Sequence, residues 1–519
     1  SEIEVFMINF LSFSDSAKYA DIARSLVLGL GYGSSFSFWS TSLFSFLKQS
    51  TFSASGILPV MPFSIALFFR IFGVSDYSVI ATSFFYFVLT LAITYLLGRK
   101  IFKSNLVGAL SALTVGFNYD LIHYATGGAS ESPFIFEILA ACYFVSLKKK
   151  WWTLVSIILL ILMYFTRPQA FIYIAGIILY WLLTNFKRKK ALITFGIVLI
   201  VGFLADYFVL RNFAGKYFLY SVTSRGLSSA LAQTISTSAS DALRGVSGVS
   251  SGGLAQIVKN IFYNLYNFYK LLPQIISPYL FAVFVIGLFI KAKDKLESSF
   301  KIASVFMTMV TFLVVAASIP FFRYIHPVVP LIYIIAVGTL VWIVEQISSN
   351  KKFIILTSTF LILLFGVGQT IGILTLDSRF ERNTHNVGKP PVYVVLSQIL
   401  KANTSSDQVV ITNLDTWGTW YGERKTVWFP LMPKQIIDPA TGKIPFDAIY
   451  LTSYLIDDEN YYMGKDWRMI FENPSDPKKW NCEGCSEIAK EFALKGAYKV
   501  GSNDNYERQD ASAILLIKK

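Results

Sequence analysis

Apolar runs of 16 to 22 residues recur along most of the chain and are separated by short polar loops. A membrane-spanning helix needs about 20 such residues. The pattern therefore predicts a polytopic α-helical membrane protein with about ten or eleven transmembrane helices. Ten spans are predicted, over residues 78–98, 106–124, 132–147, 151–166, 169–186, 191–210, 273–290, 302–320, 327–346 and 353–374.

The loops between these runs alternate in charge. One set, "GRKIFKSN", "LKKK", "FKRKK", "KAKDKLESSFK" and "SSNKK", carries 16 Lys and Arg residues, whereas the short loops of the other set carry one arginine each or none. Loops rich in Lys and Arg stay in the cytoplasm. We therefore expect residues 15–77 and the segment after 374 to face the non-cytoplasmic side.

Residues 57–73, "ILPVMPFSIALFFRIFG", are apolar enough to be an eleventh span. The loop that follows has one Arg and one Asp, so it lacks the excess of Lys and Arg that is typical of cytoplasmic loops. Two prolines at the start of the segment suit a helix that begins at an interface. We predict a helix lying on the outer membrane surface.

The opening "SEIEVFMINFLSF" is too short to span, and we expect a first helix, or most of one, to precede it.

The pattern changes after the last span. Short alternating runs such as "QVVITN", "KTVWFP", "FDAIYLT", "GAYKVG" and "SAILLIKK" predict strands, and "PPVYVVLSQILKAN" and "CSEIAKEFALKG" predict helices. The chain is therefore expected to have a transmembrane domain, residues 1–374, and a C-terminal extracytoplasmic α/β domain, residues 375–519. The first domain would have external loops at 13–77 and 211–272. The second of these is a lid over a site or simply mobile.

The net charge of +14 does not indicate nucleic-acid binding. Residues 377–519 carry 18 basic and 19 acidic residues, so the basic excess belongs to the membrane part, where it sets orientation.

Of three cysteines, two form "CEGC" in the C-terminal domain. Zinc would need two more ligands. A disulfide between Cys482 and Cys485 is expected, with two free thiols as the alternative.

Polar residues gather at the predicted outer ends of the spans. Ionisable groups at membrane depth usually face a cavity or a partner. Together they suggest a site for an anionic, polar-headed ligand approached from the lipid. The candidates are Asp15, Lys18, Tyr19, Asp21, His123, Glu131, Arg167, Arg211, Asn212, Arg323, Tyr324 and His326.

Each candidate also has a purely structural interpretation. A single arginine at a span end often anchors its helix at the interface. His326 would then only bond to a neighbouring loop. In "DSAKYADIARSL", apolar residues at helical spacing leave Asp21 on the wet face of an interfacial helix. Asp15, just ahead of that helix, would be its N-cap.

The stretch "DSAKYADIA" resembles the first external loop of GT-C glycosyltransferases, which include dolichyl-phosphate-mannose protein mannosyltransferases and bacterial aminoarabinose transferases of lipid A. Asp15, Tyr19, Ala20 and Asp21 match that pattern. "LPVMPFSIALFFRIFG", "SESPFIFEILAACYF", "TRP", "LRNFAGKYF" and "RYIHPVVPLIYI" resemble later segments, in the same order. The resemblance extends from residue 13 to about 346. It departs where Ser16 replaces a second adjacent acid and where no charge precedes the juxtamembrane proline.

The resemblance implies an integral membrane glycosyltransferase that moves a sugar from a polyprenyl-phosphate donor to a protein, lipid or glycan acceptor on the non-cytoplasmic face. Asp15 would be the general base and Glu131 would assist. Arg167, Arg211 and Arg323 would bind the donor phosphate. Tyr19, Asp21, Tyr324 and His326 would complete the site.

No cofactor is firmly implied. A divalent metal ion held by some of Asp15, Glu131, His123 and His326 is one alternative. The expected partners are the donor, membrane lipids and the acceptor, but no nucleic acid. Two other functions stay open. One is a non-catalytic scaffold of GT-C descent, acting as a subunit of a membrane complex. The other is a transporter of lipid-linked sugars.

Overall fold

The computed structural model of the chain describes residues 10–39, 41–54, 57–205, 254–317, 321–367, 390–430, 432–454, 463–501 and 510–519. It divides into two compact units. The first comprises residues 1–82, 127–129 and 377–519, and the second residues 83–126 and 130–376. These units divide the chain differently from a boundary at residue 374, because the first external segment packs with the C-terminal residues.

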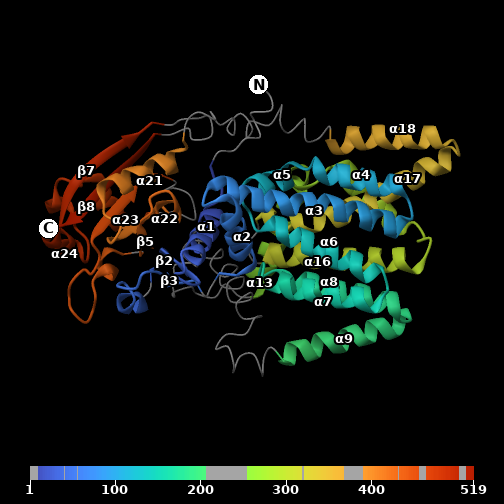
Figure 1. Ribbon diagram of the computed structural model, residues 1–519, viewed down its shortest axis with the longest axis horizontal. Coiled ribbons are helices and arrows are strands. Elements are labelled where there is room, and N and C mark those ends of the chain that lie inside the picture. The colour runs from blue at the N-terminus through green and yellow to red at the C-terminus, as the bar shows by residue number, and fades with distance from the viewer. Residues whose placement is uncertain are drawn as a thin grey trace. The chain divides into compact units, whose positions relative to one another are not determined.

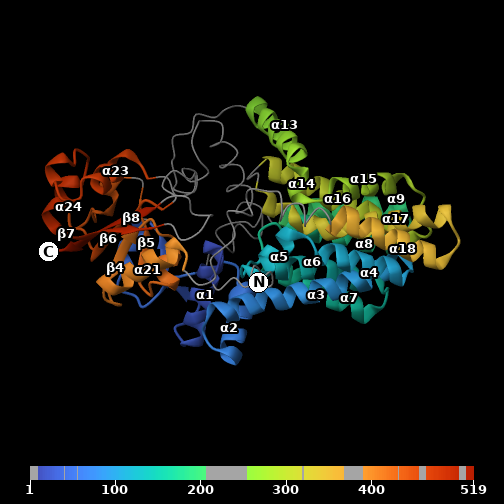
Figure 2. The same cartoon turned by 90° about the horizontal axis from the view of Figure 1, so that it is seen from above.

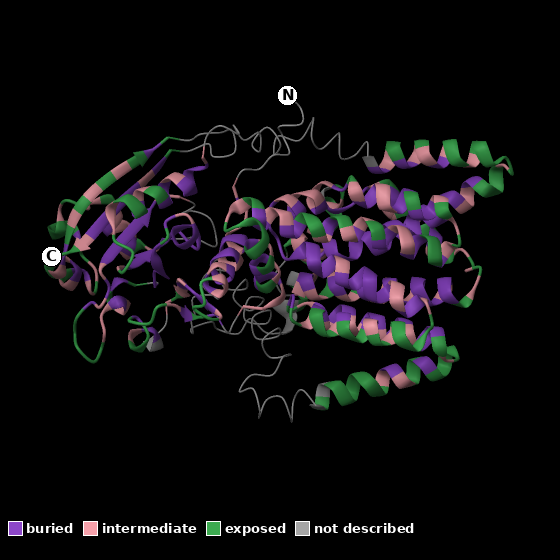
Figure 3. Ribbon diagram, in the orientation of Figure 1, coloured by how far each residue is buried: buried purple, intermediate pink, exposed green. Residues whose placement is uncertain are grey.

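The second unit is a helical bundle whose long helices run side by side (Figure 1). Its central helix is α17, which is buried along most of its length (Figure 3). Helix α3 (Asp76–Phe102) begins in the first unit and continues into the second. The other helices of the second unit are α4 (Asn105–Gly116), α5 (Tyr119–Thr126), α6 (Glu131–Ser146), α7 (Lys150–Tyr164), α8 (Ala170–Asn185), α9 (Arg188–Ala205), α13 (Leu254–Lys270), α14 (Leu272–Ile275), α15 (Pro278–Phe289), α16 (Lys295–Ala317), α17 (Val329–Ile347) and α18 (Lys351–Ile362). Short elements are η4 (Phe322–Tyr324), η5 (His326–Val328) and the π-helix η6 (Leu363–Val367).

Each predicted span contains at least one of these helices, so the predicted α-helical fold class is confirmed. Two spans are broken. Residues 106–124 divide into α4 and α5, and residues 273–290 divide into α14 and α15, with Pro278 at the first position of α15. Within the described residues, three helical stretches are long and apolar enough to cross a membrane: Asp76–Phe102, Lys295–Ala317 and Phe322–Ile347. The ends of spans 191–210 and 353–374 lie outside the described residues.

The bundle packs through small residues inside and exposes apolar ones outside. A Cβ at Gly176 of α8 would collide with the side chain of Met307 on α16, so glycine allows these helices to approach closely. The flanking helices α9 and α18 are largely exposed (Figure 3), yet carry apolar side chains such as Ile200 and Phe360 on that surface. Such exposed apolar surface is typical of helices that face lipid.

In the first unit, α2 (Val60–Phe72) begins after Pro59 and lies within predicted segment 57–73. Its 13 residues span about 20 Å, less than the roughly 30 Å of a bilayer core. One face, including Met61 and Ile65, is buried, while Phe63 and Leu67 are exposed. A short helix that is apolar on both faces suits the predicted position at a membrane surface.

A six-stranded sheet forms the centre of the first unit, in the order β2-β5-β4-β6-β8-β7. Strands β2, β5, β4 and β6 are parallel, and β8 and β7 are antiparallel to their neighbours. Its strands are β2 (Phe36–Phe38), β4 (Val409–Thr412), β5 (Lys425–Trp428), β6 (Ala448–Thr452), β7 (Phe492–Val500) and β8 (Ala511–Lys518). A separate two-stranded sheet pairs β1 (Gly33–Ser34) with β3 (Phe52–Ser53).

Alternate side chains of the sheet enter two separate cores, as expected for a sheet covered on both faces. Val410 and Tyr450 pack with α1 (Ser14–Val27), α2 and α21 (Val392–Asn403). Ile411 and Ile449 pack with α23 (Lys465–Glu472) and α24 (Cys485–Glu491). Figure 2 shows α21 and α23 on opposite sides of the strands. The short helix α22 (Trp417–Trp420) follows β4.

The five predicted strands and the helix predicted over 390–403 are present. The helix predicted over 485–496 is only half right, because α24 ends at Glu491 and residues 492–496 belong to strand β7. The structure pairs Cys482 with Cys485 in a disulfide, with their Cα atoms 5.3 Å apart. The bond lies at the beginning of α24, where Cys485 is buried in the second of the two cores.

Candidate active site

Glu131 is the centre of a buried cluster of charges in the second unit. It is the first residue of α6, where the positive end of the helix dipole favours a carboxylate. Its Oε1 lies 2.8 Å from Nη1 of Arg167 and 2.9 Å from Nε of Arg323. Arg167 Nη1 also donates to Ser130 Oγ at 2.9 Å. Two arginines far apart in sequence therefore share one carboxylate.

Tyr324 joins the same cluster. The guanidinium carbons of Arg167 and Arg323 lie 5.6 Å and 5.7 Å from the centre of its ring. Cations at this distance are attracted to the electron-rich face of an aromatic ring. Four residues singled out in the sequence, Glu131, Arg167, Arg323 and Tyr324, are thus brought together. Arg211, the third arginine, lies outside the described residues.

His326 belongs to a neighbouring cluster in the same unit. Its Nε2 lies 3.0 Å from Asp120 Oδ2, and its Nδ1 lies 3.1 Å from the hydroxyl of Tyr124. When Nε2 donates to the carboxylate, Nδ1 accepts from the phenol, so both neighbours fix the ring in one orientation. His123 instead stacks on Tyr119, with ring centres 5.9 Å apart.

Asp120 and Tyr124 were not anticipated from the sequence. They lie four residues apart on α5, and so on one face of that helix. That spacing, in a short polar interruption between apolar segments, is the signal that could have identified them. Only the fold shows that His326, some 200 residues later, lies beside both.

Asp15 belongs to the first unit, not to the unit that contains Glu131. It lies in the first turn of α1, whose N-cap is Phe13, so the interpretation of Asp15 as the N-cap is wrong. Lys18 Nζ lies 3.5 Å from its Oδ1. The Asp15 side chain keeps 38% of its surface exposed, which leaves room for a ligand. Tyr19 is partly buried against the core.

A second carboxylate, Asp415, lies near this end of α1. It follows β4, and the next residue, Thr416, donates through its hydroxyl to the Ser14 carbonyl at 2.5 Å. Asp415 is buried and has a left-handed backbone, with φ of 55°. Burial raises the pKa of its carboxyl, Lys18 and Ser14 lower it, and Asp15 raises it. Its position after a buried parallel strand was the signal in the sequence, since loops at that edge often form sites.

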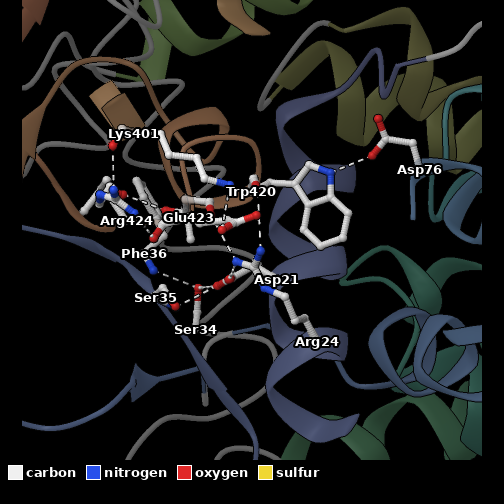
Figure 4. Close-up of polar contacts among 12 residues, drawn as sticks. Asp21, Arg24, Ser34, Ser35, Phe36, Asp76, Lys401, Trp420, Glu423 and Arg424 are labelled. Carbon is white, nitrogen blue, oxygen red and sulfur yellow. Dashed lines mark hydrogen bonds and ion pairs between the residues drawn. The ribbon is translucent and has the colours of Figure 1, made fainter. Parts of the chain in front are cut away.

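Asp21 does not lie on a solvent-exposed face of α1, so the prediction that it does is wrong. It is fully buried, and its Oδ1 accepts from Arg24 at 2.7 Å. Its Oδ2 accepts from Ser34 Oγ at 2.8 Å and from the Ser35 amide at 2.6 Å (Figure 4). The polar side of α1 is covered because the strand segment after it folds back over the helix. Asp21 is therefore part of the structural framework of the first unit.

The residues suggested for a metal site do not form one in the described part of the chain. There, no three His, Cys, Asp or Glu side chains gather as metal ligands would. Glu131 faces two guanidinium groups, which would repel a divalent cation. His123 and His326 also have separate partners.

Comparisons with known proteins agree with this architecture. Residues 56–207 match the family model "Dolichyl-phosphate-mannose-protein mannosyltransferase". Comparison with curated protein sequences finds no match.

Two solved structures share the fold. One is ArnT from Cupriavidus metallidurans bound to undecaprenyl phosphate, with 10% identity and a TM-score of 0.56, covering 99% of this chain and 96% of ArnT. The other is the oligosaccharyltransferase of Archaeoglobus fulgidus in complex with Zn and sulfate, with 12% identity and a TM-score of 0.52. That match covers 94% of this chain and 68% of the archaeal protein. The family match over residues 56–207 and the shared fold along nearly the whole chain confirm the resemblance to the GT-C superfamily of integral membrane glycosyltransferases.

Proposed function

We propose that the chain transfers a sugar from a polyprenyl-phosphate donor to an acceptor on the non-cytoplasmic face of a membrane. The observation that carries this proposal is the Glu131 cluster, in which two arginines from separate parts of the chain meet at one carboxylate. The matched family is named for a dolichyl-phosphate donor, and ArnT binds undecaprenyl phosphate. A fixed cation inside a membrane unit suits a lipid phosphate.

Arg323 is the residue proposed to contact the donor phosphate. Its side chain is 27% exposed, whereas that of Arg167 is 6% exposed. Arginine stays protonated and matches the geometry of phosphate oxygens. Glu131 is proposed as a positioning residue, because its Oε1 orients both guanidinium groups. Arg323 would then stabilise the negative charge that develops on the phosphate as it leaves.

Asp15 is the proposed general base. The acceptor hydroxyl would attack the anomeric carbon and form the new glycosidic bond. The bond between that carbon and the phosphate oxygen would break, and polyprenyl phosphate would leave with the electron pair. Asp15 would take the hydroxyl proton. Its partial exposure and its place in the first turn of α1 support this role.

The test uses the purified full chain, a lipid-linked sugar and the release of polyprenyl phosphate as the readout. Asp15→Asn should lower the rate about 10²–10⁴-fold while binding of undecaprenyl phosphate persists. Arg323→Gln should weaken that binding about tenfold or more, because a charged hydrogen bond is lost. Arg70→Gln, at an exposed position of α2, is the matched control and should behave like wild type.

Normal turnover by Asp15→Asn would contradict its role as the base. Lipid binding by the wild type without transfer to any acceptor would favour the scaffold. Movement of lipid-linked sugar across vesicle membranes without release of polyprenyl phosphate would favour the transporter.

A further inference from the structure

A cavity of about 610 Å³ lies in the second unit, at the opposite end of α6 from Glu131. Ser146, the last residue of α6, lines it, and Glu131 is the first residue of that helix. The 16 residues between these ends correspond to about 24 Å. The cavity is therefore separate from the Glu131 cluster.

The walls of the cavity carry a strong excess of positive charge. Five lining residues are basic and one is acidic: Arg99, Lys100, Lys103, Lys148, Lys295 and Asp294. They come from three loops that the sequence assigns to the cytoplasmic side. Among the described residues, the one ion pair within this set joins Lys103 Nζ to Asp294 Oδ2 at 2.7 Å. The remaining four cations have no carboxylate partner in the described part of the chain.

Two of these lysines occupy backbone positions that lysine fills poorly. Lys103 follows α3 and Lys148 follows α6, with φ of 54° and 55°. This left-handed conformation is strained for residues with a Cβ, and helices most often place glycine there. The chain itself uses Gly29 and Gly73 at positive φ after α1 and α2. Orientation by the positive-inside rule needs lysine nearby, but it needs neither this conformation nor a cavity.

We propose that this cavity binds the phosphate of an anionic headgroup, with Lys103 and Lys148 as its ligands. Leucines line it beside the charges, including Leu96, Leu147 and Leu296, so it offers apolar contact as well as cations. A basic pocket between transmembrane helices on the cytoplasmic side is suited to anionic lipid. A free phosphate would meet the same cations, and the experiment separates these two sources.

The test measures binding of dioctanoyl-phosphatidylglycerol to the full chain in detergent by microscale thermophoresis, with dioctanoyl-phosphatidylcholine and inorganic phosphate in parallel. The variant Lys103→Gly/Lys148→Gly should bind phosphatidylglycerol about thirtyfold more weakly, from the usual contribution of two lysines near an anionic surface. Its melting temperature should not fall, because glycine suits positive φ. Asp294→Asn should bind more tightly, because it removes the competing carboxylate and keeps the cap on α16.

The matched control is Lys187→Gln/Lys189→Gln, which removes the same charge from the predicted cytoplasmic side but outside the cavity. It should bind phosphatidylglycerol as wild type does. An equal loss in the control, or no loss in the glycine variant, would overturn the proposal. Binding of phosphatidylglycerol alone identifies a lipid site, and binding of inorganic phosphate as well identifies a soluble phosphate. Binding of phosphatidylcholine with equal affinity would overturn it too.

Discussion

Glu131 accepts through one oxygen from Arg167, which is buried, and from Arg323, which is partly exposed, so its removal breaks both ion pairs. Glu131→Gln should lower the free energy of unfolding by about 3 kcal/mol, because one partner of a buried ion pair is lost. Arg323→Gln should lower it less, since Glu131 keeps Arg167. Thermal unfolding in detergent compares the two variants with wild type. Equal melting temperatures for all three proteins would mean that the cluster contributes nothing to stability.

Asp415 links stability to pH. Burial raises the pKa of its carboxyl in the folded protein, so the folded state holds this proton more tightly than the unfolded state. Its contribution to stability is present below the unfolded pKa of about 3.9 and is lost as pH rises through the higher folded pKa. Asp415→Asn carries no such proton and should remove this decline. Melting temperatures of both proteins, measured from pH 4 upward, should diverge; parallel curves would contradict the assignment.

Individual side chains were predicted unevenly from the sequence. Arginines and an acid at span ends stood out, because charge is rare beside apolar runs, and the structure joins three of them in one cluster. Asp120 and Asp415 were missed because their partners are distant in sequence. Asp21 was misjudged because an apolar stripe tells only which face is buried against the core. It does not tell what covers the polar face.

At the scale of elements, α1 is held to the segment after it through Asp21. Arg24, which pairs with Asp21, also donates to the carbonyl of Thr419 at 3.0 Å and stacks over Trp420 at 5.0 Å (Figure 4). One carboxylate thus connects α1, the strand segment near Ser34 and the short helix α22. In the same view, Asp76 at the beginning of α3 accepts from Trp420 Nε1 at 2.6 Å.

Asp21→Asn should therefore destabilise the first unit by about 2–3 kcal/mol, because a buried charged network loses its anion. Asp15→Asn should change stability little, since its partner Lys18 is 3.5 Å away and Asp15 is partly exposed. Limited proteolysis and thermal unfolding give the readout, and turnover should follow the folded fraction of the Asp21 variant. A fully stable but inactive Asp21→Asn would instead place Asp21 in the catalytic machinery.

Long elements were easier to predict than short ones. Membrane helices follow from local hydropathy, which needs no knowledge of the fold. The breaks at α4–α5 and α14–α15 were missed because only two residues separate the helices at each of them. Strand β2 was missed for another reason: it has three residues and pairs with β5, whose residues come very much later in the chain. Such pairings cannot be recognised from local alternation.

For the whole molecule, the pairing of β2 with β5 supports one part of the predicted topology. Strands of one sheet lie on one side of a membrane, so the opening segment and the C-terminal region share a side. An even number of crossings must separate them, as the ten predicted spans do.

Cysteine labelling with an impermeant maleimide in intact cells tests the side itself. Ser50→Cys and Ser405→Cys should both be labelled, because both positions are exposed and are predicted to face outward. Ser349→Cys, in the predicted cytoplasmic loop before α18, should be labelled only after permeabilisation. Cys142 is buried and the other two cysteines form a disulfide, which keeps the background low. Labelling of Ser349→Cys in intact cells would reverse the orientation.

The sheet that contains β2 also determines when this unit can form during synthesis. Arg24 and Thr419, which hydrogen-bond to each other, are 395 residues apart. At roughly 5–20 residues per second, the ribosome needs about 20 to 80 seconds to make the chain between them. Throughout that interval β2 has no β5 to pair with, while every membrane helix between them is made. The six-stranded sheet can therefore form only after the last membrane helix has been made.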